Sequence, residues 1–185
     1  LICDNIGQAK LSVAQVIKDK TFGAAGDKVL IEQRLFGEEL TVLAFCDGKT
    51  LLPLAPSQDH KRAFDHDEGP NTGGMGAYSP APLATPELME IIKRKIFDKF
   101  LAGIHREKID YRGIIYFGLM IIKNEPYVLE FNCRFGDPET QVVLPLLNHD
   151  LVDLVDLTIQ QKLTELTKVA VDARPNDRQV GQVTR

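Results

Sequence analysis

The residues of this chain best suited to chemistry lie in residues 127–139, which read Tyr-Val-Leu-Glu-Phe-Asn-Cys-Arg-Phe-Gly-Asp-Pro-Glu. Successive side chains of an extended strand point to opposite faces, so Glu130, Asn132 and Arg134 are predicted to lie in a row on one face. A carboxylate and an amide oxygen are hard ligands suited to Mg²⁺, and a guanidinium beside them can clamp phosphate. The spacing alone is equally compatible with a half-exposed strand that carries an ordinary Glu–Arg pair on its solvent side.

The other face of this strand is predicted to be buried, because its side chains are Leu129, Phe131 and Cys133. A glycine and a proline then end the strand, since proline cannot continue a ladder of hydrogen bonds. Two further carboxylates, Asp137 and Glu139, lie beside that end. Their presence favours a functional site over a plain strand.

Residues 57–82 have the most unusual composition and are predicted to form a long loop. Loops of this length in a compact domain are usually either functional or disordered. Lys61 and Arg62 can pair with phosphate, and the glycines of residues 69–76 let backbone N–H groups approach an anion closely. The alternative is a mobile surface loop with a solvated run of charges.

The composition describes one globular domain or part of a larger one: 185 residues, 44% of them hydrophobic and 26% charged. A net charge of −4 and an aromatic content of 7% give no reason to expect nucleic acid or an anionic membrane as partner. Cys3, Cys46 and Cys133 are widely spaced and lie among apolar residues. They are predicted to be buried, reduced thiols of a cytoplasmic protein and not ligands of a zinc site. No apolar run has the length of a membrane span, and no signal peptide is visible. The chain starts with Leu1, and we expect it to be a piece of a longer polypeptide.

The remaining pattern predicts both helices and strands. Helices are predicted over residues 6–20, from a cap at Thr85 to about Ile104, and over residues 151–163. Strands are predicted over residues 1–3, 27–32, 40–45, 50–54 and 113–122. The Asp47-Gly48 turn is predicted to join the strands of residues 40–45 and 50–54 into a hairpin. The strand of residues 113–122 is predicted to form a second hairpin with the Glu130 strand. The Gly-rich residues 22–26 are predicted to be a connecting turn, since no Lys-Ser/Thr follows them. Residues 164–185 form a polar tail that is predicted to be poorly ordered or part of a following element.

Three stretches together resemble the phosphoribosylamine–glycine ligase family of the ATP-grasp superfamily. They are Gln58-Asp-His-Lys-Arg62, Gly69-Pro-Asn-Thr-Gly-Gly-Met-Gly-Ala-Tyr78 and Leu129-Glu-Phe-Asn-Cys-Arg-Phe-Gly-Asp-Pro-Glu139. The Glu-Phe-Asn strand end recurs across ATP-grasp enzymes, whereas the Gly-rich stretch is far more specific to this family. The resemblance covers about residues 1–163, an ATP-grasp domain lacking its N-terminal part, and leaves residues 164–185 as a divergent tail. It implies an α+β ATP-grasp core with antiparallel sheets and packed helices.

The family resemblance also implies an activity and its cofactors. The family uses ATP and Mg²⁺ (or Mn²⁺) to join glycine to 5-phosphoribosylamine through a glycyl phosphate, giving glycinamide ribonucleotide, ADP and phosphate in de novo purine (IMP) synthesis. Glu130 and Asn132 correspond to the metal ligands, and Arg134 to a catalytic residue that faces the phosphates. The nucleotide-binding positions are Glu32, Gln33, Arg34 and Leu35 at the adenine, Glu39 at the ribose, and Arg62 and Asn71 on the long stretch.

Two departures from the superfamily pattern leave alternatives open. Residues 116–119, on the strand before the metal strand, carry no acid where many ATP-grasp enzymes have one, so the number of metal ions stays open. The family's N-terminal domain and its phosphate-binding lysine would precede Leu1, and its C-terminal domain would follow. The alternatives are a truncated, non-catalytic chain that binds Mg-nucleotide or a partner, and another ATP-grasp carboxylate–amine ligase. The parent protein can be monofunctional or fused to other purine-synthesis domains.

Overall fold

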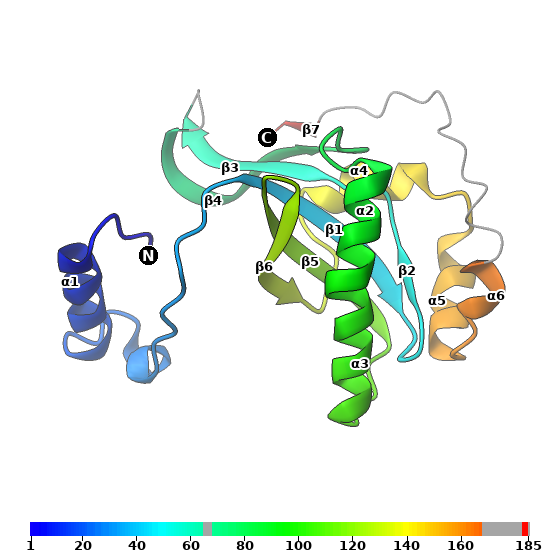
Figure 1. The fold of residues 1–185 in the computed structure, drawn as a ribbon, viewed down its shortest axis with the longest axis horizontal. Helices are drawn as coiled ribbons and strands as arrows, with labels where there is room; N and C mark the ends of the chain where they lie inside the picture. The colour runs from blue at the N-terminus through cyan, green and yellow to red at the C-terminus, as the bar shows by residue number, and fades with distance from the viewer. Residues whose placement is uncertain (65–67, 168–182, 185) are drawn as a thin grey trace. The chain divides into compact units, whose positions relative to one another are not determined.

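The computed structural model of the chain describes residues 1–64, 68–167 and 183–184 (Figure 1). Within these ranges the side chains of residues 61–63, 68, 70, 71, 167, 183 and 184 are not described. The chain divides into two compact units, Leu1–Phe36 and Gly37–Arg185. No helix among the described residues is long and apolar enough to cross a membrane.

The first unit contains the helix α1 (Ile6–Ile17) and the short 3-10 helix η1 (Gly23–Asp27). The side chain of Asn5 caps α1 by accepting the backbone N–H of Gln8 at 3.0 Å, which confirms the predicted helix start. The strands predicted over residues 1–3 and 27–32 are wrong, because residues 1–3 and 28–32 are irregular and Asp27 is the last residue of η1. Leu30 and Ile31 are 81% and 74% exposed, so the apolar run that predicted the second strand has no partner sheet in the described part of this unit.

The second unit is built on an antiparallel sheet of four strands in the order β2-β1-β5-β6. The strands are β1 (Glu38–Cys46), β2 (Leu51–Pro53), β5 (Gly113–Ile122) and β6 (Glu125–Asn132). Both predicted hairpins, β1–β2 and β5–β6, are confirmed. The turn of the second hairpin holds Lys123 and Asn124 at positive φ, as tight hairpin turns require.

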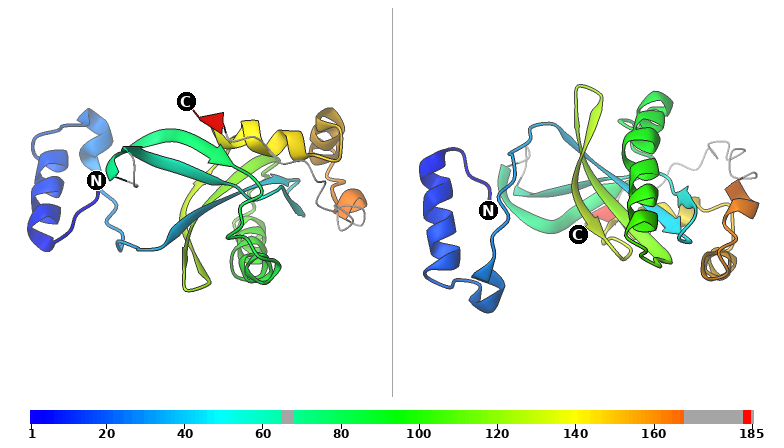
Figure 2. Two further views of the ribbon diagram at one scale, coloured as in Figure 1. Left: turned by 90° about the horizontal axis from the view of Figure 1, so that it is seen from above. Right: turned by 60° about the horizontal axis from the view of Figure 1, so that its bottom comes forward.

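Helices cover both faces of this sheet, as the two views of Figure 2 show. One face packs against a long helical segment whose predicted cap, Thr85, accepts the N–H of Leu88 at 3.2 Å. That segment consists of α2 (Pro86–Ile92), a π-helical turn η3 (Lys93–Phe97) and α3 (Asp98–Arg106). The other face packs against α4 (Glu139–Val143), η4 (Leu144–Leu146), α5 (Leu151–Ile159) and α6 (Thr164–Thr167).

The alternation of side chains along β1 and β5 separates two apolar cores. Leu40, Val42 and Ala44 of β1 face the long helical segment, together with Ile115 and Phe117 of β5. The intervening side chains face α4 and α5, and they include Leu43, Phe45 and Tyr116. Because both faces are covered, the two strands read as nearly continuous apolar runs. Tyr116 therefore lies on the same side of the sheet as α4.

Residues 57–82 do not form the predicted long loop, and this prediction is wrong. They contain the hairpin of β3 (Gln58–Phe64) and β4 (Glu68–Tyr78), with irregular register between His60 and Phe64. The short strand β7 (Val183–Thr184) pairs with Gly76 and Ala77. Residues 168–182 of the predicted polar tail lie outside the described residues. The family-based boundaries at 163 and 164 stay a prediction.

The burial of the cysteines and of β6 was only partly predicted. Cys46 is buried as expected, but Cys3 is half-buried and Cys133 is exposed, so the prediction is wrong for these two. Phe131 remains 48% exposed, although its ring contacts those of Phe117 and Phe100 at centroid distances of 5.5 and 5.6 Å. The reason is that β6 is an edge strand of the sheet, so its side chains are covered from fewer directions.

Candidate functional site

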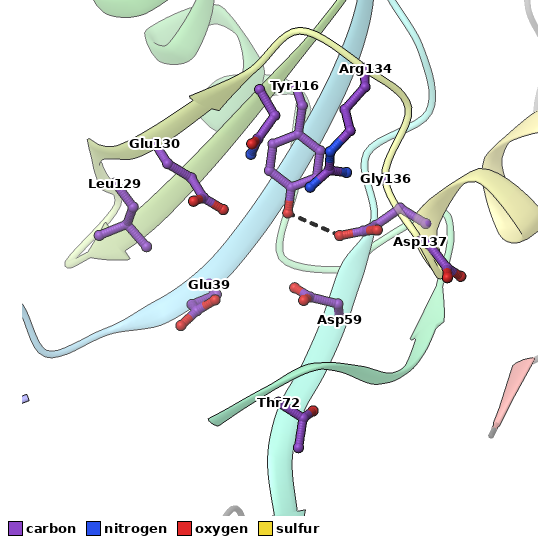
Figure 3. Close-up of a pocket in the computed structure, with 11 residues that line it drawn as sticks. Glu39, Asp59, Thr72, Tyr116, Leu129, Glu130, Arg134, Gly136 and Asp137 are labelled. Atoms are coloured by element: carbon purple, nitrogen blue, oxygen red, sulfur yellow. Dashed lines mark hydrogen bonds between the residues drawn. The ribbon is translucent and has the colours of Figure 1, made fainter. Parts of the chain in front are cut away.

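A cavity of about 420 Å³ in the second unit collects most of the residues that the sequence singled out in this unit (Figure 3). The four strands β1, β3, β4 and β5 each contribute one side chain to its wall, and β6 with the segment after it contributes the rest. The lining residues are Glu39, Asp59, Thr72, Tyr116, Leu129, Glu130, Asn132, Arg134, Gly136, Asp137 and Glu139. The predicted residues Glu39, Glu130, Asn132 and Arg134 are thus brought together.

Glu130 and Asn132 reach the cavity because of where β6 pairs with β5. Glu130 lies opposite Gly118, and Asn132 lies opposite Tyr116. A Cβ atom on residue 118 would lie 2.9 Å from Cγ of Glu130, so this glycine makes room for the carboxylate. A register shift places Val128 opposite Leu119 and leaves Leu129 in a bulge. Leu129 therefore lines the cavity beside Glu130, and its predicted orientation toward the opposite face is wrong.

Arg134 lies beyond the end of β6, and its side chain still lines the cavity (Figure 3). Its Nη1 donates to the carbonyl oxygen of Phe135 at 3.0 Å. Among the described residues it forms no ion pair with Glu130, which argues against the alternative of an ordinary Glu–Arg pair on the strand. The guanidinium keeps most of its donors for a ligand.

The two sequence motifs meet at the cavity through a close backbone contact. Gly74 of β4 has φ +126°, and a Cβ atom there would lie 2.6 Å from Cδ of Pro138. A side chain at this position is excluded by both conformation and space. Gly74 thus lets β4 lie directly against the segment that carries Asp137 and Glu139.

A buried hydrogen-bonded chain forms one wall of the cavity, and its central residue, Tyr116, was not predicted from the sequence. The hydroxyl of Tyr116 lies 2.9 Å from Oγ1 of Thr41 and donates to Oε1 of Glu139 at 2.9 Å (dashed line in Figure 3). Burial raises the pKa of Tyr116 well above its usual value, and the nearby carboxylates of Glu139 and Asp59 add to the rise. Tyr116 is therefore a neutral donor at any physiological pH. Its only signal in the sequence is a hydroxyl within an otherwise apolar strand.

Acidic side chains outnumber basic ones among the described residues that line the cavity. Arg134 is the basic side chain among the described lining residues. Five carboxylates line the cavity, those of Glu39, Asp59, Glu130, Asp137 and Glu139. Figure 3 shows the side chains of Glu39, Asp59 and Glu130, which come from three different strands. No three Asp, Glu, His or Cys side chains in the described ranges are placed to hold a metal by themselves. The carboxylate of Glu130 and the amide of Asn132 nevertheless fit Mg²⁺ or Mn²⁺, which complete their shells with water and phosphate oxygens.

The predicted adenine-binding residues lie in the other unit. Glu32, Gln33 and Arg34 line an apolar cavity of about 590 Å³ within Leu1–Phe36, and Leu35 is not among its lining residues. Arg34 forms an ion pair with Asp4 and lies over the ring of Phe36 at 4.5 Å. The backbones of Arg62 and Asn71 pair across β3 and β4, but their side chains lie outside what the structure describes. The nucleotide-binding roles of all these residues remain predictions.

Similar proteins cover most of this chain. It is 51% identical over 164 residues to the trifunctional purine biosynthetic protein adenosine-3 of Gallus gallus. The aligned residues make up 89% of this chain and 16% of that protein. It is 50% identical over 170 residues to the phosphoribosylamine–glycine ligase of Nostoc, which is 91% of this chain and 40% of that protein. The chain thus spans less than half the length of these relatives.

Solved structures share the fold. The crystal structure of phosphoribosylamine–glycine ligase from Thermotoga maritima matches with a TM-score of 0.73 at 35% identity, over 87% of this chain and 41% of that one. D-alanine–D-alanine ligase from Bacillus anthracis, complexed with ATP, matches with a TM-score of 0.51 at 18% identity, over 85% of this chain and 48% of that one, and shows the fold alone. These matches confirm the predicted α+β ATP-grasp core. Residues 1–140 match the family described as phosphoribosylglycinamide synthetase, ATP-grasp (A) domain, and the chain therefore belongs to that family.

Proposed function

We propose that this chain carries the metal- and phosphate-binding part of a phosphoribosylamine–glycine ligase. The observation that supports this most is the convergence of Glu130, Asn132 and Arg134 on one cavity. The proposed reaction joins glycine to 5-phosphoribosylamine and converts ATP to ADP and phosphate, in de novo purine synthesis. The names of the relatives and the family match of residues 1–140 support this activity.

The residues of the cavity suit both steps of this reaction. In the first step the carboxylate of glycine takes the γ-phosphoryl group of ATP, and Arg134 can bind the oxygens of the transferred group. Glu130 and Asn132 would hold Mg²⁺ or Mn²⁺, which neutralises phosphate charge when bound. In the second step the sugar amine forms a C–N bond with the acyl carbon, and the C–O bond to phosphate breaks. The cavity wall of β3 and β4 would limit the access of water to the acyl phosphate.

The proposal includes the nucleotide-binding roles that the family resemblance implies. Glu39 has the carboxylate needed to accept hydrogen bonds from ribose hydroxyls and lines the same cavity as Glu130. The proposed adenine site is formed by residues 32–35, where backbone groups can read the base. Arg62 and Asn71, adjacent across β3 and β4, would contact the nucleotide. Residues 71–76 would also shape the side occupied by glycine and phosphoribosylamine.

A second candidate function is binding of Mg-nucleotide without ligation. The same convergence of Glu130, Asn132 and Arg134 on one cavity would support it. Another ATP-grasp carboxylate–amine ligase is less well supported, because D-alanine–D-alanine ligase is only 18% identical. Fusion to other purine-synthesis domains is supported by the trifunctional relatives. The cytoplasmic location is part of the same proposal.

The test is release of phosphate from ATP by the purified chain. Glycine and phosphoribosylamine are supplied together, and each is then withheld in turn. Release that requires both substrates supports the ligase. A folded chain that binds Mg-nucleotide but releases no phosphate supports the binding-only function instead.

A further inference from the structure

Glu139 is a buried carboxylate on the wall of the cavity, only 3% exposed. A buried carboxylate is costly unless hydrogen bonds and a positive charge compensate for the lost water. The hydroxyl of Tyr116 supplies one hydrogen bond, to Oε1. No Lys, Arg or His with a described side chain forms an ion pair with this carboxylate. Its negative charge is thus available to a cationic ligand.

The fold holds this carboxylate in place with a glycine and an aromatic ring. A Cβ atom on residue 136 would lie 2.8 Å from Cδ of Glu139 and 3.0 Å from Cε2 of Tyr116. On the other edge of the same ring, a Cβ atom on residue 118 would lie 3.3 Å from Cε1 of Tyr116 and 2.9 Å from Cγ of Glu130. One tyrosine ring therefore separates two carboxylates, each seated over a glycine.

We propose that Glu139 binds the α-ammonium group of glycine and that Tyr116 positions it for this role. The inference rests on the proposed ligase function and adds to it the residue that recognises the substrate's amino group. Glycine is a zwitterion at neutral pH, and its ammonium nitrogen is separated from the carboxylate carbon by a single carbon atom. The ammonium site must therefore adjoin the place where the carboxylate is phosphorylated. Glu139 lines the same cavity as Arg134 and Asn132 and meets this condition.

The assignment to glycine, and not to the sugar amine, follows from charge. The attacking amine of phosphoribosylamine must be uncharged to act as a nucleophile, whereas the amine of glycine takes no part in bond formation and keeps its proton. A buried carboxylate is best complemented by the group that stays cationic. Glu139 accordingly makes the site selective for glycine over glycolate, which has a hydroxyl in place of the ammonium group.

The experiment compares the binding of glycine and glycolate by the purified chain with Mg²⁺ and a non-hydrolysable ATP analogue, measured by calorimetry. Glu139→Gln keeps the shape of the side chain and its ability to accept from Tyr116. It is expected to weaken glycine binding by roughly 10- to 100-fold, as loss of a charged hydrogen bond would. Glycolate affinity should stay within about threefold, since no such bond is lost. Tyr116→Phe should give a smaller loss, again for glycine only.

Glu107→Gln is the matched control, because Glu107 is exposed and pairs with Arg106 at the end of α3. Unfolding curves verify that each variant is folded. The proposal is overturned if Glu139→Gln keeps the preference for glycine, if it weakens both ligands equally, or if the wild type does not distinguish them. Phosphate release separates this result from the proposed function. If glycine binding depends on Glu139 but the chain releases no phosphate, only the proposed ligase function is refuted. If Glu139→Gln turns over with an unchanged KM for glycine, only the role of Glu139 is refuted.

Discussion

Replacement of Gly136 by alanine should lower the free energy of unfolding, because the added methyl group would clash with two buried side chains of the cavity wall. The new Cβ would lie 2.8 Å from Cδ of Glu139 and 3.0 Å from Cε2 of Tyr116, closer than packed atoms tolerate. These two residues are only 3% and 4% exposed, so neither can move freely into solvent. If the neighbours shift together, overpacking costs about 1–3 kcal/mol. If the Glu139 carboxylate instead turns away, the loss of a buried hydrogen-bond partner costs about 1–3 kcal/mol.

Both routes therefore give a loss of about 1–3 kcal/mol, to be measured by urea unfolding and by the midpoint of thermal unfolding. At about 2–4 °C per kcal/mol for a chain of this size, the midpoint should fall visibly. Gly103→Ala is the control, because a Cβ atom there meets nothing within 4 Å and the residue lies inside α3. Alanine should stabilise that helix by roughly 0.5–1 kcal/mol. A Gly136→Ala variant as stable as the wild type would refute the packing described for Glu139 and Tyr116.

Three further predictions test other parts of the second unit. Glu130→Gln should weaken Mg²⁺-dependent nucleotide binding, and an unchanged affinity in a titration with and without Mg²⁺ would contradict the assigned metal ligand. Asp47→Ala should lower the free energy of unfolding by about 2–4 kcal/mol, because the buried carboxylate of Asp47 accepts the backbone N–H groups of Lys49, Thr50 and Leu163. Asp110→Ala is its control and should lower it by less than about 1 kcal/mol, because Asp110 is exposed. Stability should fall as pH rises above about 10, where tyrosines of the unfolded chain ionise while folded Tyr116 keeps its proton. Tyr116→Phe should make this fall less steep in urea unfolding at pH 9 and 11, and an equal slope would refute it.

The parts of the fold that could be predicted are those with local signals. The helix after Thr85 has a capping side chain and Pro86 in its first turn, and its apolar residues recur at helical spacing. The β5–β6 hairpin was recognisable because an apolar strand, a short polar turn and an alternating strand follow one another. The row of Glu130, Asn132 and Arg134 followed from the period of a strand, and its members do line one cavity.

The parts that could not be predicted depend on partners distant in the sequence. β4 contains several glycines and a proline, which are residues that disfavour strands. It is a strand because β3 pairs with it, and Gly74 lies close to Pro138. The bulge at Leu129 changes which face this side chain occupies, and a bulge has no sequence signal as clear as alternation. Residues 27–32 show the opposite error, since an apolar run predicts a strand even where no neighbouring strand pairs with it in the described unit.

The arrangement around Tyr116 explains why two glycines far apart in the sequence serve one site. Gly118 lies on β5 and Gly136 lies after β6, yet a Cβ atom on either would press against an opposite edge of the same ring. Each glycine leaves space for a carboxylate, Glu130 at one edge and Glu139 at the other. Like charges in one cavity repel, and the ring lies between the two carboxylates while its hydroxyl donates to Glu139. On the proposals made above, Glu130 would hold a metal ion beside the phosphates and Glu139 would bind the ammonium group of glycine. On these proposals the cavity would contain two neighbouring cation sites, one at Glu130 and one at Glu139, on opposite edges of the Tyr116 ring.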